Sequence, residues 1–260
     1  FIEQTQYWPD AAELAVSSKP FSGQLFDGEI LHATGLGTNV PLSKLNGGRP
    51  FVLLDACEET PTVDAVNFPN EEAERAAMQH LIDRGCRNIA IVGHRFTPRA
   101  DLAHVQNAFA LRLRGACGAL SDAGLPYDES MVFEAGDVAN GIIAGHAIAE
   151  RILAARSGHG GTEFDGACCA NDFAAFGVIR GLADRGLRVP QDVKVIGFDG
   201  VTSGSYTTPA LSTIQVDLTQ LAKFSVDMLS ERIDHGTDEA LPPRRAIIGY
   251  QLVDRESTAV

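Results

Sequence analysis

Residues 164–200 read FDGACCANDFAAFGVIRGLADRGLRVPQDVKVIGFDG. Two short apolar runs, residues 166–170 and 193–198, flank a helical pattern that begins at Asn171 and closes at Gly186. Unbroken apolar character, rather than alternation, is typical of parallel strands that are covered on both faces. The stretch is therefore predicted to form one β-α-β unit.

The same alternation of strand and helix continues on both sides of this unit. Further apolar runs predict buried strands at residues 28–33, 51–55 and 88–93. Further periodic patterns predict helices at residues 70–85, with Asn70 as the N-cap, at 109–124, and at 218–233. Strands that alternate with helices of this length predict an α/β doubly wound fold.

Composition limits the classes of protein to which the chain can belong. It has 260 residues, 45% apolar and 21% charged, which is enough for two small domains or one large one. No signal peptide and no apolar run of about 18 residues is evident, so no membrane association is expected. The five cysteines are odd in number, which predicts reduced thiols and a cytoplasmic location. The net charge of -13 disfavours binding of this chain to DNA.

Several segments together resemble the LacI/GalR family of bacterial transcription regulators, in family order and over nearly the whole chain. The most specific are residues 169–178 (CANDFAAFGV) and 188–200 (RVPQDVKVIGFDG), supported by residues 80–93, 208–214 (TPALSTI) and 252–258 (LVDREST). The resemblance implies two Rossmann-like lobes with parallel sheets, of the periplasmic-binding-protein-like type I, joined by three crossovers, with an effector bound between them.

The resemblance also implies how the chain divides. The N-terminal lobe is expected to comprise residues 1–94 and 217–243, and the C-terminal lobe residues 95–216 and 244–260. Family members begin with a helix-turn-helix and a hinge helix, whereas this chain opens at what resembles the second strand of the lobe, residues 1–5. The first βα unit is therefore expected to be missing, and operator DNA to be contacted only through the missing N-terminal domain.

Two charged residues are the leading ligand-binding candidates that the resemblance implies. Asp199 follows the strand at 193–198, and open α/β sheets bind ligands beyond the carboxyl ends of their strands. Its carboxylate suits two vicinal hydroxyls of a sugar, but the alternative is a turn aspartate before Gly200. Arg112 occupies the family position for an arginine that reaches the ligand, and its planar fork can hold two oxygens. The alternative for Arg112 is a surface charge beside an apolar helix face.

Four further residues are expected to contact the ligand, each with a structural alternative. Asn171 could bind a hydroxyl or serve only as a helix N-cap. His32 after its strand and Glu72 in the first helical turn are implied by the resemblance, although a lone histidine at a strand end is more often structural. Phe173 could stack on a sugar face, but a phenylalanine at this helix position is usually a core residue.

The resemblance further implies a ligand class and an assembly. Val138, Val216 and Leu218 stand where some family members carry aromatic or polar side chains, which disfavours a purine and leaves open which small sugar is bound. A homodimer is expected because a palindromic operator requires two-fold protein symmetry. Tyr206 is the candidate interface residue, and the alternative is an ordinary exposed tyrosine.

No motif for catalysis, for a cofactor or for a metal occurs in the chain. Neither a nucleophile elbow, a phosphate loop nor a paired-histidine zinc motif is present. The chain is therefore predicted not to be an enzyme but the allosteric effector-sensing domain of a DNA-binding repressor. The alternative is a solute-binding protein of a sugar ABC transporter, against which the unpaired cysteines argue.

Overall fold

The computed structural model describes residues 27–32, 49–57, 61–134, 141–156, 164–235 and 241–259. The chain divides into two compact units, Phe1–Phe68 with Leu218–Ile248 and Pro69–Asp217 with Gly249–Val260. It therefore passes between the units three times, as the resemblance implied. None of the helices in the described ranges combines the length and the apolar character that crossing a lipid bilayer requires.

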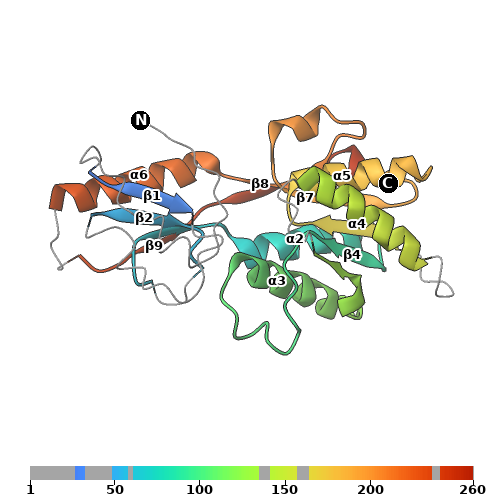
Figure 1. Ribbon diagram of the computed structural model, residues 1–260, viewed down its shortest axis with the longest axis horizontal. Helices are drawn as coiled ribbons and strands as arrows, with labels where there is room; N and C mark the ends of the chain where they lie inside the picture. The colour runs from blue at the N-terminus through green and yellow to red at the C-terminus, as the bar shows by residue number, and fades with distance from the viewer. Residues whose placement is uncertain are drawn as a thin grey trace. The chain divides into compact units, whose positions relative to one another are not determined.

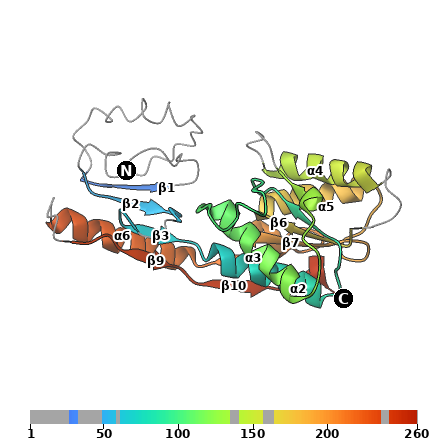
Figure 2. The same ribbon diagram turned by 90° about the horizontal axis from the view of Figure 1, so that it is seen from below.

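Among the described residues, the first unit has a parallel sheet of four strands in the order β1-β2-β3-β9. The strands are β1 (Glu29–His32), β2 (Phe51–Leu54), β3 (Ala65–Asn67) and β9 (Arg245–Ile247). Helix α6 (Leu218–His235) packs against β1, β2 and β3 on one face of this sheet (Figure 2). Strand β2 is buried at its two central residues and half-buried at its ends, which explains its continuous apolar character.

One buried carboxylate connects three segments of the first unit. Asp64, directly before β3, accepts two hydrogen bonds from Arg232 of α6, at 3.0 and 2.9 Å. It also accepts the backbone N–H of Arg244 at 2.8 Å and the guanidinium of Arg244 at 3.0 Å. Burial acts to raise the pKa of Asp64, but the hydrogen bonds from the two arginines outweigh it and hold that pKa below its ordinary value.

The second unit has a six-stranded sheet in the order β10-β8-β7-β6-β4-β5, parallel except for the antiparallel edge strand β10. The strands are β4 (Ile89–Val92), β5 (Val132–Phe133), β6 (Gly166–Cys169), β7 (Lys194–Asp199), β8 (Ser212–Val216) and β10 (Tyr250–Val253). The helices are α2 (Asn70–Asp83), α3 (Ala108–Asp122), α4 (Gly141–Arg156) and α5 (Asp172–Asp184). Three short 3-10 helices are η2 (Glu129–Met131), η3 (Thr202–Ser205) and η4 (Glu256–Thr258).

Helices cover both faces of this sheet. Helices α4 and α5 pack together on one face, and α2 and α3 pack together on the other (Figures 1 and 2). The core on the α4–α5 side is formed by small and branched apolar residues, among them Ala90, Ala167, Val178, Leu182 and Val195. A sheet covered on both faces is the arrangement that the apolar runs predicted, and the α/β fold class is confirmed.

The structure differs from the expected division of the chain by one residue at Asp217 and by longer segments at the other two boundaries. Residues 69–94 lie in the second unit, because β4 pairs with β6 and β5 of the six-stranded sheet. Residues 244–248 lie in the first unit, because β9 pairs with β3. The sequence had assigned both segments to the opposite lobe, since an apolar run predicts a strand but does not say which strand it pairs with.

Two local predictions about helix starts had different outcomes. Asn171 is the N-cap of α5, where its side chain accepts the backbone N–H of Ala174 at 2.8 Å. The prediction for Asn70 is wrong: Pro69 occupies the cap position, and Asn70 is the first residue of α2 with its side chain buried. The amide of Asn70 is used instead in a long-range contact that involves Arg112.

Candidate ligand-binding site

Arg112 is the centre of the candidate site. Although it carries a full charge, it is only 9% exposed. Its Nε donates to the side-chain oxygen of Asn70 at 2.8 Å, and its Nη1 donates to the backbone oxygen of Ala170 at 2.6 Å. The guanidinium carbon lies 3.6 Å from the centroid of the Phe198 ring, which is a close cation–π contact. The arginine is therefore held in one orientation from three sides.

These contacts bring three of the predicted ligand residues to one end of the sheet. Asn171 directly follows Ala170 at the end of β6, and Asp199 directly follows Phe198 at the end of β7. Strands β6 and β7 are parallel neighbours, so both residues lie at the same edge. Arg112 contacts the residue before each of them. This is the edge at which open α/β sheets bind ligands.

The backbone at Asp199 has an uncommon conformation. Its φ is 109°, in a region that favours glycine, and the next residue, Gly200, has a φ of 77°. A positive φ at a residue with a side chain costs free energy, and such residues concentrate at functional sites. Asp199 therefore meets one structural criterion for a functional residue, although aspartate also tolerates this conformation better than most residues do.

The remaining predicted residues are dispersed. Phe173, in the first turn of α5, is 46% exposed and meets Phe176 edge to face, with ring centroids 5.9 Å apart. Glu72 is exposed in the first turn of α2. His32 is exposed at the carboxyl end of β1 in the other unit. Tyr206 is 85% exposed directly after η3. Val138 lies outside the described residues.

Sequence reasoning missed the residues that hold Arg112 in place. Asn70 was assigned only to a helix cap, and Phe198 only to a buried strand. Asp172 also has a structural use, because its carboxylate accepts Thr213 Oγ1 at 2.6 Å and the backbone N–H of Val201 at 2.7 Å. The polar identity of Asn70 on the buried side of α2 was the only available signal for its role.

A close helix crossing fixes the distance between Arg112 and Asn70. Gly115, one turn after Arg112 on α3, packs so tightly against α2 that a Cβ atom would overlap the backbone oxygen of Glu71. We predict that Gly115→Ala lowers the free energy of unfolding by about 1–3 kcal/mol, because backbone atoms cannot move aside locally. Urea unfolding followed by circular dichroism measures this change.

Gly118→Ala on the same helix is the matched control. A Cβ at Gly118 meets only the guanidinium end of Arg75, a flexible side chain that can move. Alanine also has the higher helix propensity, so this variant should be as stable as the wild type or slightly more stable. Equal unfolding free energies for the two variants would contradict the tight crossing.

The groups at this edge can bind a polyhydroxyl ligand but are poorly suited to covalent catalysis. Arg112 supplies hydrogen-bond donors, as does the Nδ2 of Asn171, whose Oδ1 is used in the helix cap, and Asp199 supplies acceptors. The nearby Cys168 and Cys169 are buried, and burial raises the pKa of both thiols well above the ordinary value. Within the described ranges, no group of three His, Cys, Asp or Glu side chains is arranged to hold a metal ion.

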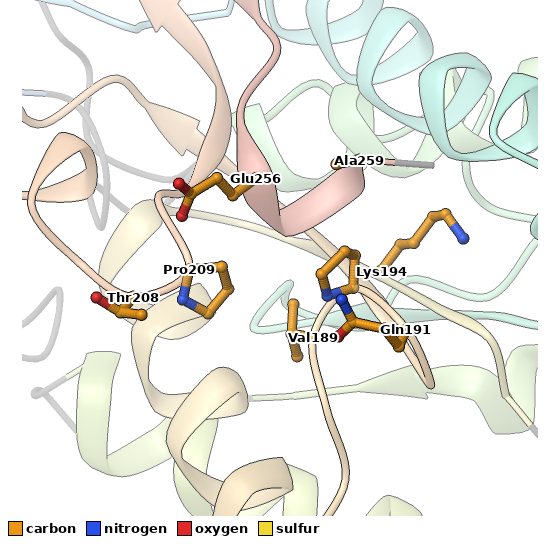
Figure 3. Close-up of a pocket in the computed structure, with 8 residues that line it drawn as sticks. Val189, Gln191, Lys194, Thr208, Pro209, Glu256 and Ala259 are labelled. Atoms are coloured by element: carbon orange, nitrogen blue, oxygen red, sulfur yellow. The ribbon is translucent and has the colours of Figure 1, made fainter.

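A surface cavity of about 600 Å³ lies at the other end of the same strands. Its lining comes from the segments before β7 and β8 and from the C-terminal segment: Val189, Pro190, Gln191, Lys194, Thr208, Pro209, Glu256 and Ala259. Figure 3 shows Thr208 and Pro209 on one side and Val189 and Gln191 on the other. The cavity is far from Arg112 along the strands, so we place the candidate site at the carboxyl ends and not here.

Comparisons with known proteins identify the family. A family model described as a periplasmic binding protein-like domain matches residues 78–258. The HTH-type transcriptional repressor PurR of Aliivibrio fischeri is 31% identical over 208 residues, which is 80% of this chain and 58% of the repressor. The chain belongs to the LacI/GalR family. It spans less than two thirds of the length of this LacI/GalR relative.

Solved structures support the LacI/GalR fold as well. A LacI-type transcription regulator from Bifidobacterium animalis has a TM-score of 0.80 and 29% identity, with 96% of this chain and 84% of that chain covered. The transcriptional regulator CelR in complex with cellobiose has a TM-score of 0.78 and 27% identity, with 95% and 71% covered. Both are similar to this chain over nearly all of its length, so the type I periplasmic-binding-protein-like fold applies to both units.

Proposed function

We propose that this LacI/GalR chain is the effector-sensing domain of a cytoplasmic DNA-binding transcriptional repressor and that it binds a small sugar, a neutral monosaccharide or small glycoside. The ligand contacts are Arg112, Asn171 and Asp199, with Phe173 as a stacking platform and Glu72 and His32 as further polar contacts. The protein does not catalyse a reaction and needs no cofactor.

One observation carries this proposal. Arg112 is pinned through Nε and Nη1, while none of the described residues accepts a hydrogen bond from its Nη2. A guanidinium has five N–H donors, so the fixed guanidinium of Arg112 has donors left over for acceptor oxygens of a ligand. Sugar hydroxyls accept from such a donor and can donate to a carboxylate such as Asp199.

The relatives support the regulator over the transport-linked binding protein. The repressor from Aliivibrio fischeri is named an HTH-type transcriptional repressor, and CelR was solved with a sugar. The net charge of -13 disfavours DNA contact by this chain, so we propose that operator DNA is bound by a segment outside residues 1–260. The sugar would alter operator affinity by binding one conformation of the domain better than another.

A thermal-shift screen against three ligand classes tests the proposal. The panel contains neutral sugars and glycosides, sugar phosphates, and nucleobases. A ligand at 100 times its Kd stabilises the folded state by about 2.7 kcal/mol, which is readily detected. Stabilisation by a neutral sugar is the expected result. Stabilisation by a nucleobase or a phosphorylated compound alone would overturn the proposed ligand class.

We also propose that the chain forms a homodimer in which Tyr206 lies at the interface. An aromatic side chain that is 85% exposed in a described loop is well placed for burial against a partner. We predict that Tyr206→Asp converts the dimer to a monomer, because burial of an unpaired charge opposes association. Sedimentation equilibrium at protein concentrations of tens of micromolar, on the order of what weak interfaces need, measures the fraction of dimer.

Ser230→Asp is the control, because Ser230 is exposed on α6 and the variant should remain dimeric. A wild type that is monomeric at these concentrations would contradict the dimer.

A further inference from the structure

A carboxylate that plays no part in the proposed ligand contacts is completely buried beside them. Glu74, on α2, has 0% exposure. Its Oε1 lies 3.1 Å from His94 Nε2 and accepts the Cys168 thiol at 3.3 Å. His94 is also 0% exposed, with its ring packed edge-on against Phe109. A buried charge needs compensation, so the question is which group supplies it.

Glu74 and the residues that bond to Arg112 lie close together on helix α2 and at the end of strand β6. Asn70, which holds Arg112 Nε, lies one helical turn before Glu74 on α2. Ala170, which holds Arg112 Nη1, lies two residues after Cys168 at the end of β6. One bond therefore holds the guanidinium of Arg112 one helical turn from Glu74, and the other holds it two residues from Cys168, which donates to Glu74. Burial acts to raise the pKa of Glu74, but the contact with His94 and then the charge on Arg112 act in the opposite direction and hold that pKa below its ordinary value.

The geometry favours a neutral imidazole at His94. Its Nε2 is at hydrogen-bond distance from Glu74, whereas its Nδ1 is buried with no partner among the described residues. A second ring proton would therefore be a buried donor without an acceptor, which is costly. Glu74 Oε2 is likewise buried without a hydrogen-bond partner there. The carboxylate keeps its negative charge, and Arg112 is the arginine whose positive charge acts on it.

We propose that Glu74 determines the charge selectivity of the site. Its buried carboxylate balances the positive charge of Arg112, so that the site binds an uncharged polyhydroxyl ligand and rejects a phosphorylated one. This inference rests on the proposed function and refines its ligand class. An arginine without a counter-charge is well suited to phosphate, because its fork binds two phosphate oxygens. Glu74 leaves the hydrogen-bond donors of Arg112 in place but removes the net attraction for an anion.

Glu74→Gln tests the inference because it keeps the shape and the acceptor of the side chain but removes its charge. The probe is inorganic phosphate, titrated calorimetrically near neutral pH with ionic strength held constant by chloride. We expect Glu74→Gln to bind phosphate at least about tenfold more tightly than the wild type. The same variant should bind the neutral sugar from the screen within about threefold of the wild type. A merely structural defect would weaken both.

Two controls locate the effect. Glu74→Gln combined with Arg112→Gln should lose the gained phosphate affinity, because the cation is gone. Asp83→Asn makes the same charge change at an exposed position of α2 and should gain no phosphate affinity. Should Glu74→Gln fold poorly, Glu74→Gln with His94→Gln replaces the buried pair by two amides that can bond to each other.

The outcomes separate this inference from the proposed function. Phosphate affinity that stays at the wild-type level in Glu74→Gln and in Glu74→Gln with His94→Gln would overturn the role of Glu74, whatever sugar the wild type binds. Failure of every neutral sugar to bind the wild type would overturn the proposed ligand class. In that case the phosphate comparison still decides whether Glu74 controls the charge at Arg112.

Discussion

Asp64→Ala is expected to destabilise the first unit by about 3 kcal/mol. The substitution removes a buried carboxylate that binds Arg232 and Arg244. Arg232 then keeps the backbone oxygens of Leu241 and Pro242, and Arg244 keeps Glu231, but neither retains the buried counter-charge. Loss of one partner of a buried ion pair costs about 3–5 kcal/mol, and the lower value applies because the arginines are partly exposed. Hydrogen exchange should accelerate about 100-fold in β3, β9 and α6, and remain unchanged in α5.

The pH dependence of this effect has a defined sign. The pKa of Asp64 is lowered in the folded state, so its stabilising contribution is present above the unfolded pKa, near 3.9, and is lost as pH falls through the folded pKa. The difference between wild type and Asp64→Ala should therefore shrink below about pH 4. Asp227→Ala, which removes an exposed pair with Lys223, should change stability by less than about 0.5 kcal/mol at any pH.

Arg112→Ala should weaken sugar binding by about 1.5–3 kcal/mol, roughly tenfold or more. The variant loses the donors directed to the ligand and leaves Asp199 to meet the sugar alone. Arg112→Lys should also bind weakly, since an ammonium cannot bond Asn70, Ala170 and a ligand with one planar fork. Calorimetric titration with the sugar from the screen measures both variants.

Arg114→Ala is the control for this prediction. Arg114 is two residues further along α3 and pairs with Glu71, so its loss removes a positive charge without touching the site. Its affinity for the sugar should equal that of the wild type. Wild-type affinity in Arg112→Ala, with unfolding free energies showing that both variants are folded, would remove Arg112 from the site.

The sequence predicted the local features of this protein well because they depend on near neighbours. The apolar runs located β1, β2, β4, β6 and β7, and the Asn171 cap and glycine stops located α5. Helix α4 was not predicted, because its residues are apolar on nearly all sides and show no clear periodic face. Strands β3 and β5 have three and two residues, too few for a pattern.

The site was predicted only in part, because half of it depends on contacts between distant residues. Asp199 and Asn171 follow strands, so their position at the ligand-binding edge could be inferred. The partners of Arg112 lie 42 and 58 residues away, and no local spacing encodes them. Glu74 was not predicted to be a site residue, and its alignment with Asn70 on the buried face of α2 was the missed signal.

A crystal structure of the chain with the sugar from the screen tests the central claim most directly. We predict ligand hydroxyl oxygens within about 2.7–3.2 Å of Arg112 Nη2 and of the Asp199 carboxylate, at the carboxyl ends of β6 and β7. Asp199→Gly should relieve the strain at φ 109° and remain folded, yet bind the sugar weakly. A sugar found away from Arg112, for example in the cavity between Pro190 and Pro209, would contradict the account.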